Sequence, residues 1–236
     1  MSDNKKNLYL LLGISLITQA TTSLIGGLIG VGPFTDTENI IAAMHSIAGN
    51  TAGVYTGILL QIITALVIMV LGTALYQAGK HINKTAAIIA LCFYFTEAIL
   101  HIICQIFIFA LAALSRQFMI NGDVILLNIV NFLFISRNFC GAITMMPFGL
   151  GAIIFYYLIM KAKVIPRWLG LWGLITVPFI LVGWSLEAFG ISVPFALYLP
   201  YVPWEWVAGG WVLVRGLRTK KNGKDSMNNE NIIDIR

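Results

Sequence analysis

The chain has 236 residues, of which 58% are hydrophobic and only 11% are charged. Soluble domains carry about 25% charged residues, so this composition excludes an ordinary soluble protein and indicates an integral membrane protein. The net charge of +5 does not point to nucleic acid, because the basic residues lie in short loops and in the C-terminal segment, a distribution typical of membrane topology and of attraction to anionic lipids.

Six apolar runs are long enough to cross a bilayer, which requires roughly 20 residues per helix. The first run follows Lys5 and Lys6, as a signal peptide would, but its apolar character continues to Val31 and favours an uncleaved span. The predicted spans cover residues 8–31, 51–77, 85–114, 139–160, 168–187 and 199–217.

This pattern predicts an all-α fold, a polytopic membrane helix bundle with six transmembrane helices and one or two outer interfacial helices. We expect one membrane domain over residues 1–217. The remaining residues, 218–236, are polar and basic and lack aromatic side chains. We expect them to form a disordered cytoplasmic tail.

Two segments outside the spans are apolar enough to form helices. Residues 38–49 have apolar side chains at helical spacing, with Thr37 as a candidate N-cap and His45 near the polar side, which predicts a short helix on the outer membrane surface. Residues 124–136 would extend span four to a helix of about 37 residues, or about 55 Å, much longer than one crossing. We interpret them as an outer interfacial or partly re-entrant helix that meets span four near Arg137.

The basic residues predict the orientation. Thirteen of the fifteen Lys and Arg residues lie in four regions on one side of a six-span bundle: the N-terminal residues, the loops 80–84 and 161–167, and the segment from Arg215 onward. By the positive-inside rule both termini are cytoplasmic, and we predict a multi-pass protein of the cytoplasmic (inner) membrane. The opposite loops carry Asp36, Glu38, Arg116 and Asp123.

Glu97 and His101 lie four residues apart, in a run with no other formal charge between residues 85 and 115. A carboxylate at bilayer depth costs roughly 2.5 kcal/mol or more, so it is a functional-site hypothesis by default. The spacing places both side chains on one helical face, where they can hydrogen-bond each other or a common ligand. The alternative is a structural carboxyl that bonds across helices.

Other polar residues fall near the midplane or in the outer half of the predicted bundle, while the inner half is nearly bare of ionisable groups. An outward-opening polar cavity would produce this asymmetry. Each residue also has a structural explanation, in helix packing for the glutamines and at the membrane interface for the outermost charges. The candidates for ligand or proton binding are Glu97, His101, Gln61, Gln105, Arg137, Glu187 and Glu205.

The sequence indicates no cofactor chemistry. Cys92, Cys104 and Cys140 lie in apolar stretches without metal-ligand spacing, so we expect buried small side chains rather than disulfides or a zinc site. Metalloprotease, α/β-hydrolase, P-loop and Rossmann motifs do not occur. We therefore expect no metal, no cofactor and no catalytic residue.

Several short motifs carry a resemblance to a known family. They are Asn39-Ile40-Ile41-Ala42, Asn83-Lys84-Thr85, Phe95-Thr96-Glu97-Ala98, Pro166-Arg167-Trp168-Leu169-Gly170, and Glu205 followed by Trp211 and Gly216. Together with the N-terminal lysines, they resemble the prokaryotic membrane proteins of the domain of unknown function 4386 family. The resemblance covers most of residues 5–217. It implies a six-span bundle and no particular activity.

The sequence favours a non-enzymatic membrane protein that binds a small or lipid-like ligand or ion in an outward-facing polar cavity, for transport or sensing. Glu97 would bind a proton or cation, and His101 would tune it. One alternative is a membrane-embedded enzyme acting on a lipid or isoprenoid substrate, with these two residues as its acid–base pair. Another is a purely structural accessory subunit. The expected partners are the lipid bilayer and a small-molecule or lipid ligand, not nucleic acid.

Overall fold

The computed structural model describes residues 3–31, 39–122 and 125–233, with side chains described for residues 4–30, 39–122 and 125–218. Within these residues the chain is all helical, which confirms the predicted fold class. The elements in chain order are α1 (Asp3–Val31), α2 (Ile40–Gly49), α3 (Thr51–Gly79), α4 (Lys84–Asn121), α5 (Ile125–Lys161), α6 (Arg167–Ala188), the 3-10 helix η2 (Phe195–Leu197) and α7 (Trp204–Ile233).

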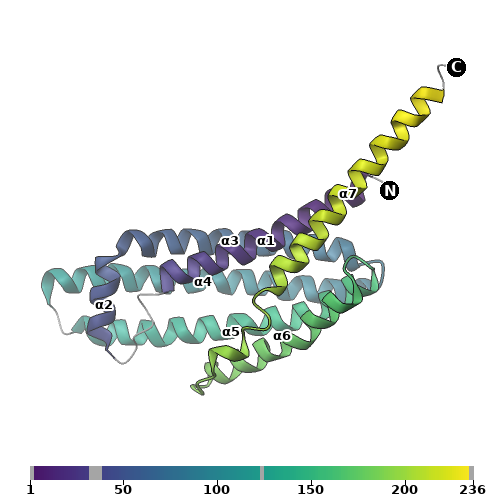
Figure 1. Ribbon diagram of the computed structural model, residues 1–236. Coiled ribbons are helices and arrows are strands. Elements are labelled where there is room, and N and C mark those ends of the chain that lie inside the picture. The colour runs from purple at the N-terminus through teal and green to yellow at the C-terminus, as the bar shows by residue number, and fades with distance from the viewer. Residues whose placement is uncertain (1–2, 32–38, 123–124, 234–236) are drawn as a thin grey trace.

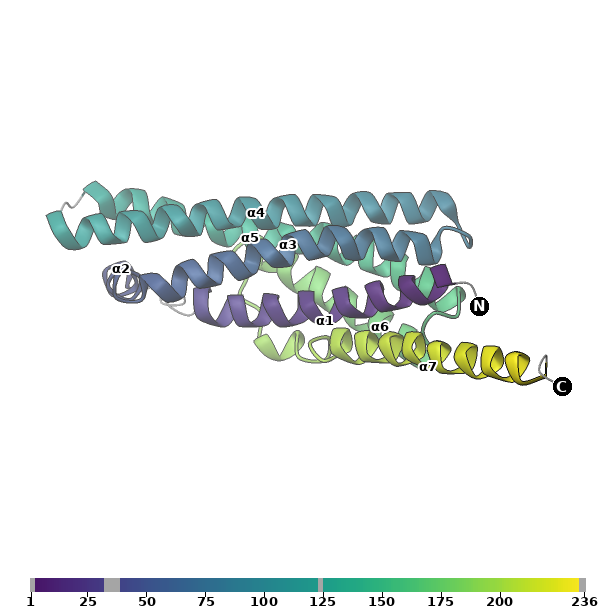
Figure 2. The same cartoon turned by 90° about the horizontal axis from the view of Figure 1, so that it is seen from above.

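Five helices are long and apolar enough to cross a membrane, namely α1, α3, α4, α5 and α6. They contain the first five predicted spans. α7 contains most of the sixth but does not belong to this group, because its apolar part, residues 204–217, is shorter than a crossing requires. It nevertheless runs beside α1 along the bundle (Figure 2). The chain is thus an integral membrane helix bundle.

The six long helices are arranged as a ring. α1 packs against α3 and α7, α4 packs against α3 and α5, and α5 also packs against α6. α6 and α7 close the ring with only a brief contact, and α1 makes no close backbone approach to α4, α5 or α6 within the described residues (Figures 1 and 2). The interior of the ring therefore has to be filled by side chains or left as cavities.

The end of the ring near the predicted cytoplasmic loops is filled. There α3 and α5 approach each other across the ring, and a Cβ added to Gly79 would lie 3.0 Å from Cβ of Leu158. Leu75, Ala78 and Ile159 are buried at the same level. This packing closes this end of the ring with apolar side chains.

Small residues allow α1 and α3 to pack closely. A Cβ added to Gly57 would lie 2.5 Å from Cα of Gly30, and one added to Gly26 would lie 3.2 Å from the carbonyl oxygen of Gly57. Glycines spaced four apart allow this backbone approach in membrane helices. In this chain they therefore form an intramolecular contact.

The interpretation of residues 124–136 as a separate interfacial or re-entrant helix is wrong. α5 is one continuous helix from Ile125 to Lys161 and pairs along its length with α4. At about 1.5 Å per residue, these helices of 37 and 38 residues are each about 55 Å long or slightly more. The ends away from the loops 80–84 and 161–167 share a second apolar core with α2 and α3, formed by Ala43, Met44, Ile47, Val54, Ile108, Leu111, Ala112, Val130 and Phe134.

The predicted helix of residues 38–49 corresponds to α2, which lies across the ends of α4 and α5 (Figure 1). Asn39 caps it by accepting the backbone N–H of Ala42 at 3.0 Å, and the expected cap, Thr37, lies outside the described residues. Ala43, Met44 and Ile47 of α2 are buried against protein, while Ile41 and His45 are exposed. Protein packing therefore holds this helix in place.

The backbone of α7 remains helical to Ile233, through the segment for which the sequence predicts disorder. This end projects beyond the rest of the bundle (Figures 1 and 2). The segment contains no proline after Pro203, so nothing in its covalent structure interrupts the helical hydrogen bonds.

Candidate functional site

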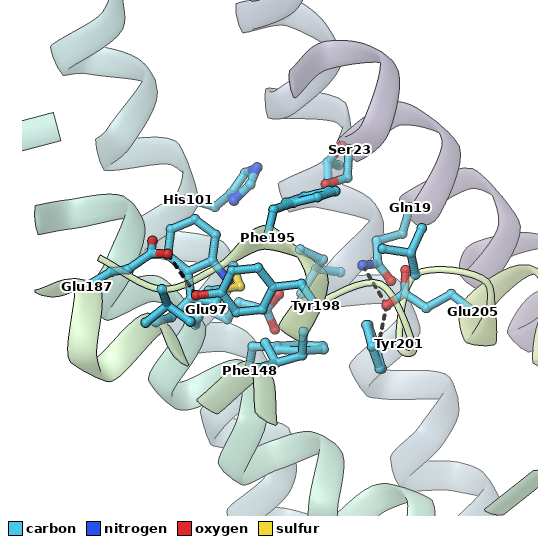
Figure 3. Close-up of a pocket in the computed structure, with 17 residues that line it drawn as sticks. Gln19, Ser23, Glu97, His101, Phe148, Glu187, Phe195, Tyr198, Tyr201 and Glu205 are labelled. Atoms are coloured by element: carbon cyan, nitrogen blue, oxygen red, sulfur yellow. Dashed lines mark hydrogen bonds between the residues drawn. The ribbon is translucent and has the colours of Figure 1, made fainter. Parts of the chain in front are cut away.

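Two adjoining cavities lie inside the ring, one near the middle of the long helices and one farther from the predicted cytoplasmic loops. The larger has a volume of about 590 Å³ and is lined by all six long helices and by the connection between α6 and α7 (Figure 3). The smaller has a volume of about 420 Å³. The two share the lining residues Ser23, His101, Met145, Trp184 and Phe195.

The structure brings all seven residues predicted from the sequence to these two cavities. The larger cavity is lined by Glu97, His101, Glu187 and Glu205. The smaller is lined by Gln61, His101, Gln105 and Arg137. His101 belongs to both and therefore lies where the two cavities meet.

Glu97, on α4, is the least satisfied polar residue of the site. Its side chain is 3% exposed, and its Oε2 atom is buried without a hydrogen-bond partner among the described residues. It is not hydrogen-bonded to His101, one of the two arrangements that the four-residue spacing allows. A buried carboxyl oxygen that lacks a partner is costly, so this atom is available to a ligand.

His101 bonds across the ring interior instead. Its Nε2 atom lies 2.7 Å from Oε1 of Gln61, and Nε2 of Gln61 donates to the carbonyl oxygen of Ser23 at 3.2 Å. Because the glutamine oxygen can only accept, the proton of this contact belongs to His101. Gln105 donates to the backbone carbonyl of His101 at 3.2 Å, while its own Oε1 atom is buried without a partner among the described residues. The hydrogen bonds of Gln61 to His101 and Ser23 therefore link α3 to α4 and α1.

Glu205, at the start of α7, is buried rather than placed at the cavity mouth or in an interfacial belt. Its Oε1 atom accepts hydrogen bonds from the Tyr201 hydroxyl at 2.7 Å and from Nε2 of Gln19 at 3.2 Å (Figure 3). The hydroxyl of Tyr156 lies 2.8 Å from that of Tyr201. The neighbouring Trp204 is fully buried and donates to the carbonyl of Leu169 at 2.8 Å. Glu205 is thus part of a satisfied network that joins α7 to the bundle.

Glu187 holds the connection between α6 and α7 over the larger cavity. Its Oε1 atom accepts the Tyr198 hydroxyl at 2.9 Å, and the Tyr198 ring stacks on Trp184 with centroids 5.5 Å apart. In Figure 3 the rings of Phe195 and Tyr198 stand between the Glu187 side of the cavity and the Glu205 side. We call residues 189–203 the strap.

The comparisons with known proteins agree with the sequence motifs. The family described as Domain of unknown function (DUF4386) matches residues 11–216. The chain belongs to the DUF4386 family. Comparison with curated proteins and with solved structures found no match. Both cavities lie within the DUF4386 region, and the family description assigns no activity to it.

Sequence reasoning missed the aromatic part of the DUF4386 site. Tyr198 and Tyr201 lie in the connection between α6 and α7, whereas the sequence predicted that the sixth span begins at residue 199. Three prolines, Pro194, Pro200 and Pro203, surround them and were the available signal, because they favour an ordered connection.

Two cysteines of the DUF4386 domain lie side by side next to the smaller cavity. The sulfur atoms of Cys104 and Cys140 are 2.8 Å apart, and the Thr144 hydroxyl donates to the carbonyl of Cys140 at 2.7 Å. Cys92 is exposed, contrary to the expectation that all three are buried. No group of three or more His, Cys, Asp or Glu residues able to hold a metal ion occurs in the part of the chain described.

Proposed function

We propose that this DUF4386 protein binds a small, largely apolar ligand in the larger cavity, and that Glu97 receives a basic or hydrogen-bond-donating group of that ligand. The observation that carries the proposal is the Oε2 atom of Glu97, which is buried without a partner in the described structure and belongs to a residue that lines a cavity of about 590 Å³. A ligand donor at this atom would remove the cost of leaving it unsatisfied.

The size and walls of the cavity support a ligand that is mostly apolar. Pockets for small molecules typically have volumes of about 300–1,000 Å³ and combine apolar walls with a few polar groups. Here the walls include Phe148, Trp184, Phe195 and Tyr198. Aromatic rings also attract a cation through their electron-rich faces. The lining thus suits an apolar body as well as a cationic head group.

The charges of the cavity support a basic head group. Three carboxyl side chains, Glu97, Glu187 and Glu205, line the larger cavity, and none of its described lining residues is Lys or Arg. Two of them already accept hydrogen bonds from tyrosines, whereas Glu97 has none at Oε2. Glu97 is therefore the carboxyl with capacity for a ligand.

The position of the cavity supports access from the outer face. Its lining includes Val193, Phe195 and Tyr198 of the connection between α6 and α7, at the end of α6 opposite the loops 80–84 and 161–167, and packing between α3 and α5 closes the end of the ring near those loops. The distribution of Lys and Arg predicts that both termini are cytoplasmic, and this orientation places the strap outside. Binding in the larger cavity would serve sensing, or transport if the α3–α5 contact near Gly79 and Leu158 opens.

The proposal is tested by binding to the detergent-solubilised protein. Equilibrium dialysis with tetraphenylphosphonium, an apolar aromatic cation, compares the wild type with Glu97→Gln, and native mass spectrometry of gently extracted protein detects a co-purified ligand. Loss of one charged contact is expected to weaken binding about tenfold. Glu230→Gln, in the C-terminal part of α7, is the matched control and should bind like the wild type. Equal binding by Glu97→Gln and wild type, or bare protein with no binding, overturns the proposal.

A further inference from the structure

A third cavity lies at the opposite end of the bundle, where the turn between α5 and α6 meets α7. Its volume is about 650 Å³, and its lining includes four basic side chains, those of Lys161, Lys163, Arg167 and Arg215. No acidic residue lines it among the residues described. This end of the ring also carries the predicted cytoplasmic loops. The charge of this cavity is thus opposite to that of the cavity around Glu97.

The rim of the cavity is held in shape by contacts within the protein. The guanidinium of Arg215 donates to the carbonyl oxygens of Lys163 and Val164, with a distance of 2.9 Å to Val164. Lys163 has a φ of 57°, in the left-handed region, and its side chain is exposed. The turn from α5 into α6 is therefore fastened to α7, and its basic side chains surround a preformed space.

The start of α6 adds to the positive potential. Pro166 precedes the helix and supplies no side-chain cap, and α6 begins with Arg167. The first N–H groups of an uncapped helix, together with its dipole, favour an anion at that end. Phosphate oxygens match both kinds of donor, the backbone N–H groups and the Lys and Arg side chains.

The remaining walls of this cavity are apolar. Met160, Ile165, Pro166, Leu171 and Trp211 complete the lining. Trp168, beside the cavity, is 53% exposed and packs edge-on against Trp211 with centroids 6.2 Å apart. Exposed tryptophan at the end of a span is typical of the lipid headgroup level. A free phosphate ion would use the basic rim but not these walls, whereas a lipid would use both.

We propose that this cavity binds the phosphate-bearing headgroup of an anionic phospholipid, with Lys161, Lys163 and Arg167 around the phosphate and the apolar walls against its glycerol and upper acyl chains. Basic pockets between membrane helices on the cytoplasmic side recognise lipid headgroups in this way. The proposal is independent of the ligand proposed for the cavity around Glu97.

The test counts phosphatidylglycerol molecules retained by the full-length protein in native mass spectrometry, from micelles of phosphatidylglycerol and phosphatidylcholine. Lys161→Gln/Lys163→Gln is compared with Lys80→Gln/Lys84→Gln, which removes two exposed charges at the same end of the bundle but outside the cavity. At roughly 1 kcal/mol per basic residue, the cavity variant should retain phosphatidylglycerol about thirtyfold less tightly. The Lys80/Lys84 variant should stay within about threefold of the wild type. Arg167→Gln serves as a second cavity variant and should also weaken retention.

Two results would overturn the proposal. Equal losses in the cavity variant and in the Lys80/Lys84 variant would show general attraction to an anionic surface. Displacement of phosphatidylglycerol by an excess of inorganic phosphate, with phosphate retained in its place, would show a site for the free ion. Melting temperature and gel filtration check that each variant is folded, since all substituted side chains are exposed.

Discussion

Nε2 of His101 on α4 lies 2.7 Å from Oε1 of Gln61 on α3, at the junction of the two ring cavities. The same glutamine donates to the carbonyl of Ser23 on α1. Three consecutive members of the ring are thus joined by one buried amide. His101, which shares a face of α4 with Glu97, is thus bonded to another helix, and Oε2 of Glu97 has no partner among the described residues.

Replacement of Gln61 by leucine should destabilise the bundle. Both hydrogen bonds are lost and His101 is left without its acceptor, and hydrogen bonds between membrane helices average about 0.6 kcal/mol with a maximum near 1.7 kcal/mol. We expect a loss of about 1 kcal/mol, measured by thermal unfolding in detergent. Gln77→Leu on the same helix is the control, since Gln77 is exposed. An equal effect of the two substitutions would contradict the assignment.

Glu97 and Glu205 should respond differently to leucine. Glu205→Leu removes the acceptor of Tyr201 and Gln19, so a loss of about 1–3 kcal/mol is expected from two buried hydrogen bonds to this carboxyl. Glu97→Leu removes a buried oxygen with no partner in the described structure and should leave the stability unchanged or raise it. Chemical or thermal unfolding of both variants makes the comparison. A large loss from Glu97→Leu would show that Glu97 is a structural residue.

The contact between α1 and α3 should not tolerate a methyl group at Gly57. The added Cβ would lie 2.5 Å from Cα of Gly30, and backbone atoms cannot move aside as a flexible side chain can. We expect Gly57→Ala to cost about 1–3 kcal/mol, the usual range for overpacking. Gly210→Ala on α7 meets nothing within 4 Å and should be neutral or slightly stabilising. The melting temperatures of both variants in detergent are compared with that of the wild type. Unchanged stability of Gly57→Ala would refute the close contact between α1 and α3.

The strap should loosen when Tyr198 loses its hydroxyl. Tyr198→Phe keeps the stacking on Trp184 but removes the donor to Glu187, a bond to a charged group worth about 1.5–3 kcal/mol. Amide hydrogen exchange of residues 189–203 should accelerate about tenfold or more, and exchange elsewhere should not change. Tyr157→Phe is the control, because Tyr157 is 47% exposed and lies far along α5 from the strap. Equal protection of the strap in both variants would mean that other contacts hold it.

Much of the fold was predictable because the signals are local. Apolar runs of membrane-spanning length identify the helices directly, and a charged residue within such a run, such as Glu97, is conspicuous because of its cost. Depth along a helix follows from a fixed rise per residue, so the sequence could place seven polar residues at similar levels. All seven line the two cavities. The fixed rise per residue was therefore the basis on which the sequence grouped these seven residues.

Other features depend on which helices become neighbours. The second core formed with α2 allows α5 to continue as one helix beyond a single crossing, and bilayer thickness alone argued against this. Pairing of His101 with Gln61, and of Glu205 with Tyr201 and Gln19, depends on how the helices are rotated in the ring.

The sequence by itself determined the membrane class and the approximate positions of the long helices, because both follow from hydrophobicity along one segment. The tertiary structure alone decided which carboxyl is satisfied and which is free, since a hydrogen bond between helices depends on their neighbours and rotation. It also decided that the strap covers the larger cavity and that four basic side chains surround a third, because these contacts join residues far apart in the chain.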